Sequence, residues 1–142
     1  MIGFLFSILA GAAMSVQGVM NTRLQDNAGL WEANAFVQGT AFVLSLAAMW
    51  LFGTGRFGAI LSSPRWQLWG GALGLVITVT VMLSIKGLSP TTAISVILIS
   101  QLLTAACIDA FGWMGQEKAV FGIHKWIGLG LMLGGVVMFK IR

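Results

Sequence analysis

The stretch Ser89–Trp113, which reads SPTTAISVILISQLLTAACIDAFGW, decides the fold. After Ser-Pro-Thr-Thr the run is mostly apolar. At about 1.5 Å of rise per residue it is long enough for a helix across roughly 30 Å of hydrocarbon. Pro90 suits the first helical turn, where its missing N–H is not needed. The stretch therefore predicts a membrane-spanning helix over residues 90–113.

Two polar side chains interrupt this predicted helix. Gln101 falls near its middle, and Asp109 follows eight residues later on roughly the same face. Because a carboxylate inside a span is costly, it usually faces protein or water. We expect Gln101, with the adjacent Ser100, to line a solute site, and Asp109 to serve proton coupling or cation attraction. The alternative for Asp109 is a hydrogen-bond anchor or an interfacial residue near Trp113.

Composition places the chain in the membrane class. Of 142 residues, 58% are hydrophobic and 8% are charged, whereas soluble domains carry about 25% charged residues. The net charge of +4 does not indicate nucleic-acid binding, because the basic residues stand singly between apolar runs. No Lys or Arg precedes the first apolar run, so we expect a retained helix rather than a signal peptide. The expected surroundings are membrane lipid.

The same pattern of apolar runs predicts an all-α membrane protein, with one transmembrane domain over residues 1–142. The connectors between the runs contain most of the charged residues. The five expected transmembrane helices cover residues 2–20, 31–52, 69–85, 90–113 and 126–139.

Two pairs of amide side chains lie near the ends of the first two predicted spans. Gln17 and Asn21 share a face of the first span at i, i+4, and Asn34 and Gln38 share a face of the second. Their functional interpretation is the lining of a cavity. The structural alternative, hydrogen bonding between helices or at helix ends, stays open.

Pairs of glycines four residues apart predict close helix packing. Gly70 and Gly74 form one such pair in the third predicted span, and Gly130 and Gly134 form another in the fifth. Small residues at this spacing let two helix backbones approach each other.

The sequence carries no pattern typical of an enzyme or a metal site. His124 is the only histidine and Cys107 the only cysteine, so no metal-ligand set, cofactor or intrachain disulfide is expected. Neither Ser100 nor Cys107 has a base nearby in sequence that would make it a nucleophile.

The connectors hold equal numbers of basic residues on the two sides of the membrane. With five spans, four Lys or Arg fall on the N-terminal side and four on the other. Since Lys and Arg set orientation, this balance predicts that both orientations are inserted and that two opposed copies pair as an antiparallel homodimer. The alternative is one orientation, set by a partner or by the insertion machinery. The two sets are Arg56, Arg65, Lys118 and Lys125, and Arg23, Lys86, Lys140 and Arg142.

The order of several short motifs resembles a known group. The run Lys86–Ala93 and the later Gly115–Lys118, Ile127-Gly128 and Gly134–Val136 are similar to half of a drug/metabolite transporter. Within that superfamily, the chain resembles the small YdcZ-like family. The motifs that carry this resemblance are Gln17…Asn21, Gly70-Gly71 and Gln101…Ile108-Asp109…Phe111-Gly112.

The resemblance implies half of a ten-helix inverted-repeat transporter, in which two five-helix halves hold a solute near the midplane. It agrees with the charge balance, which was counted independently. We therefore expect a multi-pass protein of a bacterial-type inner membrane, moving an unidentified small solute by alternating access. The alternatives are a non-transporting membrane scaffold and an ion channel built on the same antiparallel plan.

Overall fold

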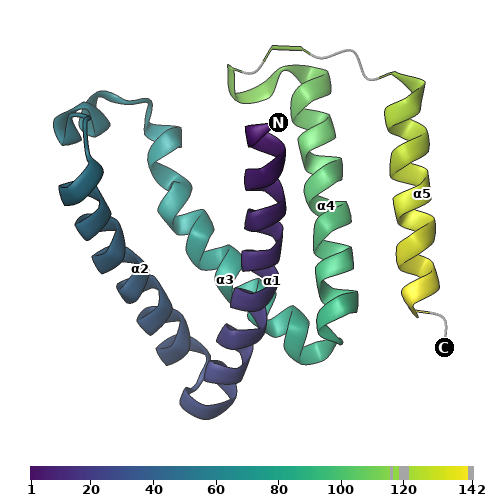
Figure 1. Ribbon diagram of the computed structural model, residues 1–142, viewed down its shortest axis with the longest axis horizontal. Helices are drawn as coiled ribbons and strands as arrows, with labels where there is room; N and C mark the ends of the chain where they lie inside the picture. Colours follow the sequence, from purple (N-terminus) through teal and green to yellow (C-terminus); the bar gives the residue numbers. More distant parts are fainter. Residues whose placement is uncertain (116, 119–121, 141–142) are drawn as a thin grey trace. The chain divides into compact units, whose positions relative to one another are not determined.

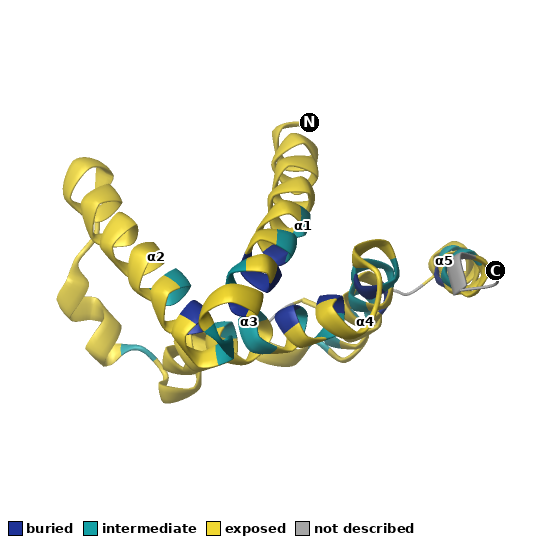
Figure 2. Ribbon diagram, turned by 90° about the horizontal axis from the view of Figure 1, so that it is seen from below, coloured by how far each residue is buried: buried dark blue, intermediate teal, exposed yellow. Residues whose placement is uncertain are grey.

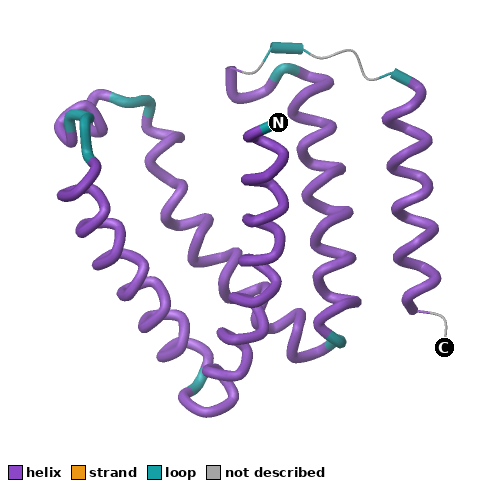
Figure 3. Tube along the Cα trace, viewed as in Figure 1, coloured by secondary structure: helices purple, strands orange, loops and turns teal. Residues whose placement is uncertain are grey.

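The computed structural model describes residues 1–115, 117–118 and 122–140, which form helices joined by short loops (Figure 3). Gln116, part of one motif, and Arg142, part of the charge count, lie outside the described residues. No strand occurs in the described ranges. The helices are α1 (Ile2–Ala28), α2 (Leu30–Phe52), η1 (Phe57–Ser62), η2 (Arg65–Trp69), α3 (Gly70–Gly87), α4 (Pro90–Phe111), η3 (Trp113–Gly115) and α5 (Ile123–Lys140).

The chain divides into two compact units, each described here by itself. The first, Met1–Gly87, contains α1, α2 and α3 with the two short 3-10 helices η1 and η2. The second, Leu88–Arg142, contains α4, η3 and α5. One transmembrane domain over the whole chain stays a prediction.

Among the described residues, four helical segments are long and apolar enough to cross a membrane: Ile2–Ala28, Leu30–Phe52, Arg65–Gly87 and Pro90–Phe111. The fifth apolar helix, Ile123–Met138, is shorter. The all-α class and the order of the apolar helices therefore follow the sequence prediction.

Helix α1 is longer than the predicted span over residues 2–20. It continues through the polar stretch Asn21–Ala28, which was expected to form a loop. No glycine or proline interrupts this stretch, and three of its side chains, Asn21, Thr22 and Gln25, are buried, so nothing ends the helix before Gly29. At 27 residues, α1 is about 40 Å long and exceeds the roughly 30 Å of a hydrocarbon core.

Helix α4 ends two residues before the predicted limit. Its N-terminus has the expected form: Ser89 is the N-cap and accepts a hydrogen bond from the Thr92 N–H, with Pro90 following. At the other end, Gly112 takes a left-handed conformation, with φ of 65°, and its N–H donates to the Ile108 carbonyl. Asp109 is therefore in the last turn of α4.

A single residue, Gly29, separates α1 from α2. Its φ of 100° lies in the region that favours glycine, and its N–H donates to the Gln25 carbonyl over 2.9 Å. The Gly29 carbonyl in turn accepts from the Ala33 N–H over 3.1 Å, so the turn ends one helix and begins the next. From this turn the two helices diverge, as Figure 1 shows.

The interior of the first unit lies near the turn, where α1, α2 and α3 meet. Figure 2 shows the buried residues of α1 and α2 gathered at their turn ends, while the other ends are exposed. The exposed ends of the helices are apolar, which suits contact with lipid. The set of buried residues near the turn, in contrast, is unusually polar. It consists of Gly18, Asn21, Thr22, Gln25, Ala33, Asn34, Met82 and Ile85.

Gly18 sets the distance between α1 and α3. A Cβ atom at this position would lie 2.8 Å from Ile85 Cδ1 and 3.2 Å from Val81 Cγ1. Ile85 Cδ1 is the end of a flexible side chain. A single methyl group at position 18 is therefore tolerated if the Ile85 side chain moves. A larger side chain has no room, because the α3 side chains already fill the space.

We expect Gly18→Leu to destabilise the first unit by about 1–3 kcal/mol through overpacking. Denaturant unfolding of the full chain in detergent measures this change. Gly11→Leu is the matched control on the same helix, because a Cβ atom at Gly11 meets nothing within 4 Å. Equal stability of the two leucine variants would show that α1 and α3 do not pack at Gly18.

Candidate functional site

Four amide side chains lie on the halves of α1 and α2 that are nearest the Gly29 turn. Asn21 and Gln25 come from α1, and Asn34 and Gln38 come from α2; we call these four the amide cluster. The exposed fractions of Asn21, Gln25 and Asn34 are 8%, 6% and 4%, and Gln38 is half-buried. The spacing of four residues places each pair on one face of its helix.

The four residues stand at matching depths from the Gly29 turn. Gln25 precedes the turn by four residues and Asn34 follows it by five, so both lie about 6–8 Å along their helices. Asn21 and Gln38 are eight and nine residues away, at about 12–14 Å. The amide cluster therefore has two levels, the deeper of which reaches toward the middle of the helices.

The deeper level connects α2 to α3. Gln38 Nε2 donates to Thr78 Oγ1 over 3.5 Å, and the Thr78 hydroxyl donates to the Gly74 carbonyl over 2.8 Å. A Cβ atom at Gly74 would lie 3.8 Å from Gln38 Nε2. This is an ordinary van der Waals distance, so Gly74 lies next to the Gln38 amide on the α2-facing side of α3.

The level nearer the turn contains two acceptor atoms without partners. Gln25 Oε1 and Asn34 Oδ1 are buried and make no hydrogen bond to any described residue. A buried polar atom without a hydrogen bond costs about 1–3 kcal/mol. Such atoms are uncommon in folded proteins and call for an explanation.

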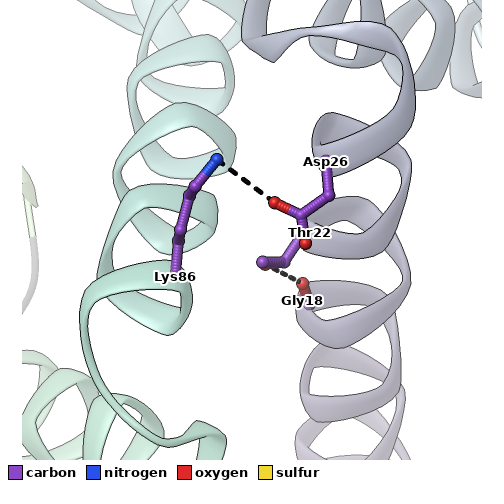
Figure 4. A network of polar contacts seen from close by, with 4 residues as sticks. All are labelled: Gly18, Thr22, Asp26 and Lys86. Carbon is purple, nitrogen blue, oxygen red and sulfur yellow. Dashed lines mark hydrogen bonds and ion pairs between the residues drawn. The ribbon is translucent and has the colours of Figure 1, made fainter.

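An ion pair joins the C-terminal ends of α1 and α3. Lys86 Nζ lies 3.2 Å from Asp26 Oδ1, one helical turn beyond Thr22, whose hydroxyl donates to the Gly18 carbonyl over 2.8 Å (Figure 4). The side chains of Lys86 and Asp26 are 54% and 41% exposed. Solvent therefore screens the pair, and it contributes at most about 1 kcal/mol.

Sequence reasoning placed three of the four cluster residues among the candidates and missed Gln25. Asn21 and Asn34 are buried and Gln38 is half-buried, whereas Gln17 is exposed on α1, and the role of all four as cavity lining stays a prediction. The signal for Gln25 was present, since it continues the four-residue spacing of Gln17 and Asn21.

The candidates in the second unit are more exposed. Helices α4 and α5 pack through Ala93, Ile99 and Leu129, which are buried. Gln101 and Ser100 are exposed on α4, and Asp109 is partly exposed in its last turn. Among the described residues, no hydrogen bond or ion pair to Asp109 is present. The negative end of the helix dipole lies there and gives a carboxylate no stabilisation.

The predicted glycine packing faces differ from one another. Gly74 approaches α2, as described above, but a Cβ atom at Gly70, Gly130 or Gly134 meets nothing within 4 Å. These three positions thus make no close helix contact in the described structure. Their role as packing faces stays a prediction.

Within the described residues, no group of three or more His, Cys, Asp or Glu side chains is arranged to hold a metal ion. His124 is exposed at the start of α5. The polar chemistry of the described residues is therefore mostly that of uncharged amides and hydroxyls, together with Asp109.

Comparison with known proteins identifies one family. The family model described as "Putative inner membrane exporter, YdcZ" matches residues 2–138, nearly the whole chain. No curated protein and no solved structure gives a match.

Proposed function

Because this chain belongs to the YdcZ family of inner-membrane exporters, we propose that it is half of a secondary transporter and works as an antiparallel homodimer. The protein is a multi-pass membrane protein of the inner membrane, in a family of transporters rather than enzymes. In the proposed mechanism, two oppositely inserted copies enclose one solute site and open it to either side in turn.

The main support for the antiparallel arrangement is the balance of basic residues. With five spans, four Lys or Arg lie on each side of the membrane. The positive-inside rule gives such a chain no preferred orientation. Two opposed copies then supply the inverted repeat that larger transporters contain within one chain. The five apolar helices are the right number for one half of that arrangement.

Exposed polar side chains on α4 favour the inference that this helix contacts a second protein subunit. Gln101 lies midway along an apolar helix and is exposed, as is Ser100 beside it. Polar groups at membrane depth are uncommon against lipid and face protein or water. We place these side chains against the second copy, where they line the solute site with Asp109 at its edge. By the same argument, we expect Gln17, exposed on α1, to face protein or water rather than lipid.

The exposed glycines suit the movement that the mechanism requires. Gly70, Gly130 and Gly134 present backbone without side chains, so a neighbouring helix can slide over them at short range. In the proposal, the two copies rock against each other through such surfaces. The solute is a small molecule of unknown identity.

Labelling from both membrane faces tests the proposal. In a Cys107→Ser background, single cysteines at Ser62 and Asn27 mark opposite sides and leave the number of basic residues unchanged. Both positions are exposed. With a membrane-impermeant maleimide, we expect each cysteine to react about half from either face, because the two orientations are equally populated. Reaction from a single face at each position would refute the antiparallel dimer.

A further inference from the structure

The two unpartnered acceptors of the amide cluster are not needed to hold the first unit together. Other contacts join its helices: Gly18 packs against α3, Gln38 bonds to Thr78, and Asp26 pairs with Lys86. Gln25 Oε1 and Asn34 Oδ1 add no hydrogen bond to these contacts and lose their hydration. An apolar side chain of the same size would fill either position at a lower free energy.

The position of these atoms is suited to a shared ligand. They come from helices that pack side by side, at similar distances from the Gly29 turn, and both side chains are more than nine-tenths buried. The deeper level, Asn21 and Gln38, continues the line of amides along the same helix faces. Two carbonyl oxygens at one level present acceptors to a molecule that donates hydrogen bonds.

The charges around the amide cluster favour a neutral ligand. None of its four members is ionisable. Of the charged residues near the turn, Arg23 and Glu32 are exposed, and Asp26 is already paired with Lys86. A charged ligand at the buried amides would lack a counter-ion. The free energy needed to remove water from such a ligand exceeds the free energy gained from hydrogen bonds to amides.

We propose that the amide cluster is a solute-binding site for a small neutral molecule with several hydrogen-bond donors, such as a polyol or a primary amide. This inference rests on the proposed transport function, adds a solute site within each copy to the one between the copies, and gives the solute its chemical class. In the present structure the two acceptors are covered. The solute reaches them when α1 and α2 separate at the Gly29 turn, which is a change of access like the one alternating access requires.

The test compares matched variants of the full chain in proteoliposomes. Labelled xylitol, myo-inositol and nicotinamide are the neutral probes, and choline and glutamate are the charged ones. We expect saturable movement of at least one neutral probe by the unaltered protein. We also expect at least a tenfold loss in Gln25→Met, in Asn34→Leu and in the variant with both changes.

Thermal unfolding of the same proteins in detergent separates binding from folding. Met and Leu match the replaced side chains in size, so without solute both variants should unfold at a higher temperature than the unaltered chain. Gln67→Met and Asn27→Leu are the controls, because both residues are exposed. The controls should change neither probe movement nor the unfolding temperature.

Three results would overturn the inference. One is full probe movement by Gln25→Met and Asn34→Leu. Another is a lowered unfolding temperature in these variants, which would show that the amides have a structural role. The third is saturable movement of charged probes alone or of no probe. Movement of charged probes alone would leave the transport function in place, whereas labelling from a single face would refute the antiparallel dimer independently of the solute.

Discussion

Two lysines added to one side of the chain are expected to reduce transport at least tenfold, without damage to the fold. Gly55→Lys with Gly58→Lys raises the basic residues on the N-terminal side from four to six against four. A Cβ atom at either position meets nothing within 4 Å, so the lysines fit. Because Lys and Arg in short connectors determine insertion, nearly all copies should take one orientation. Antiparallel pairs then cannot form.

The decisive measurement is co-expression with a variant of opposite bias. Asn27→Lys with Ala28→Lys adds the same charge to the other side, at two exposed positions. Each double variant alone should be inactive in a proteoliposome flux assay, and the two together should regain most of the activity. Gly55→Gln with Gly58→Gln controls for side-chain size. Full activity of either lysine variant alone would rule out the antiparallel dimer.

The second large effect is expected at Asp109. The chain has four Asp and Glu residues. Asp26 is paired with Lys86, Glu32 lies in the first turn of α2, and Glu117 is in a connector. Among the described residues, Asp109, in the last turn of the spanning helix α4, is the one of the four that neither pairs with a lysine, nor lies at a helix N-terminus, nor stands in a connector. An intramembrane carboxylate is costly and marks a proton or cation pathway by default.

We expect Asp109→Asn to reduce solute-coupled proton movement at least tenfold while solute exchange continues. The asparagine keeps the size and hydrogen bonding of the side chain but cannot carry a proton between its two states. A pH-sensitive dye inside proteoliposomes records the proton movement, and Glu117→Gln is the control outside the helix. Unchanged coupling in Asp109→Asn would remove this residue from the mechanism.

The class of the protein was predictable from the sequence because apolar length and charge content are local properties. The run from Pro90 to Phe111 is long enough to span a membrane and has few polar residues, whatever it packs against. The N-cap at Ser89 depends on the residues next to it in the sequence alone. The error over residues 21–28 has a physical cause. Polar composition was taken to indicate a loop, whereas helix formation there depends on burial that the sequence does not display.

The candidate site was predictable in part. The four-residue spacings of Asn21 and of Asn34 with Gln38 identified amide-bearing faces, but a face on one helix does not reveal the helix it meets. Gln25 lies on the same helix face as Asn21 because α1 continues to Ala28. Gly70 and Gly74 share one motif, and only Gly74 approaches a neighbour.

By itself the sequence determined the protein family and the five apolar runs. It also determined the number of basic residues in the segments between these runs and the polar side chains within them. These features depend on composition and on the fixed rise and turn of a helix. Tertiary structure alone decided that Gln25 and Asn34 are buried at one level without partners. That outcome depends on the positive φ of Gly29, which turns α1 into α2, and on the absence of a side chain at Gly18, which lets α1 approach α3.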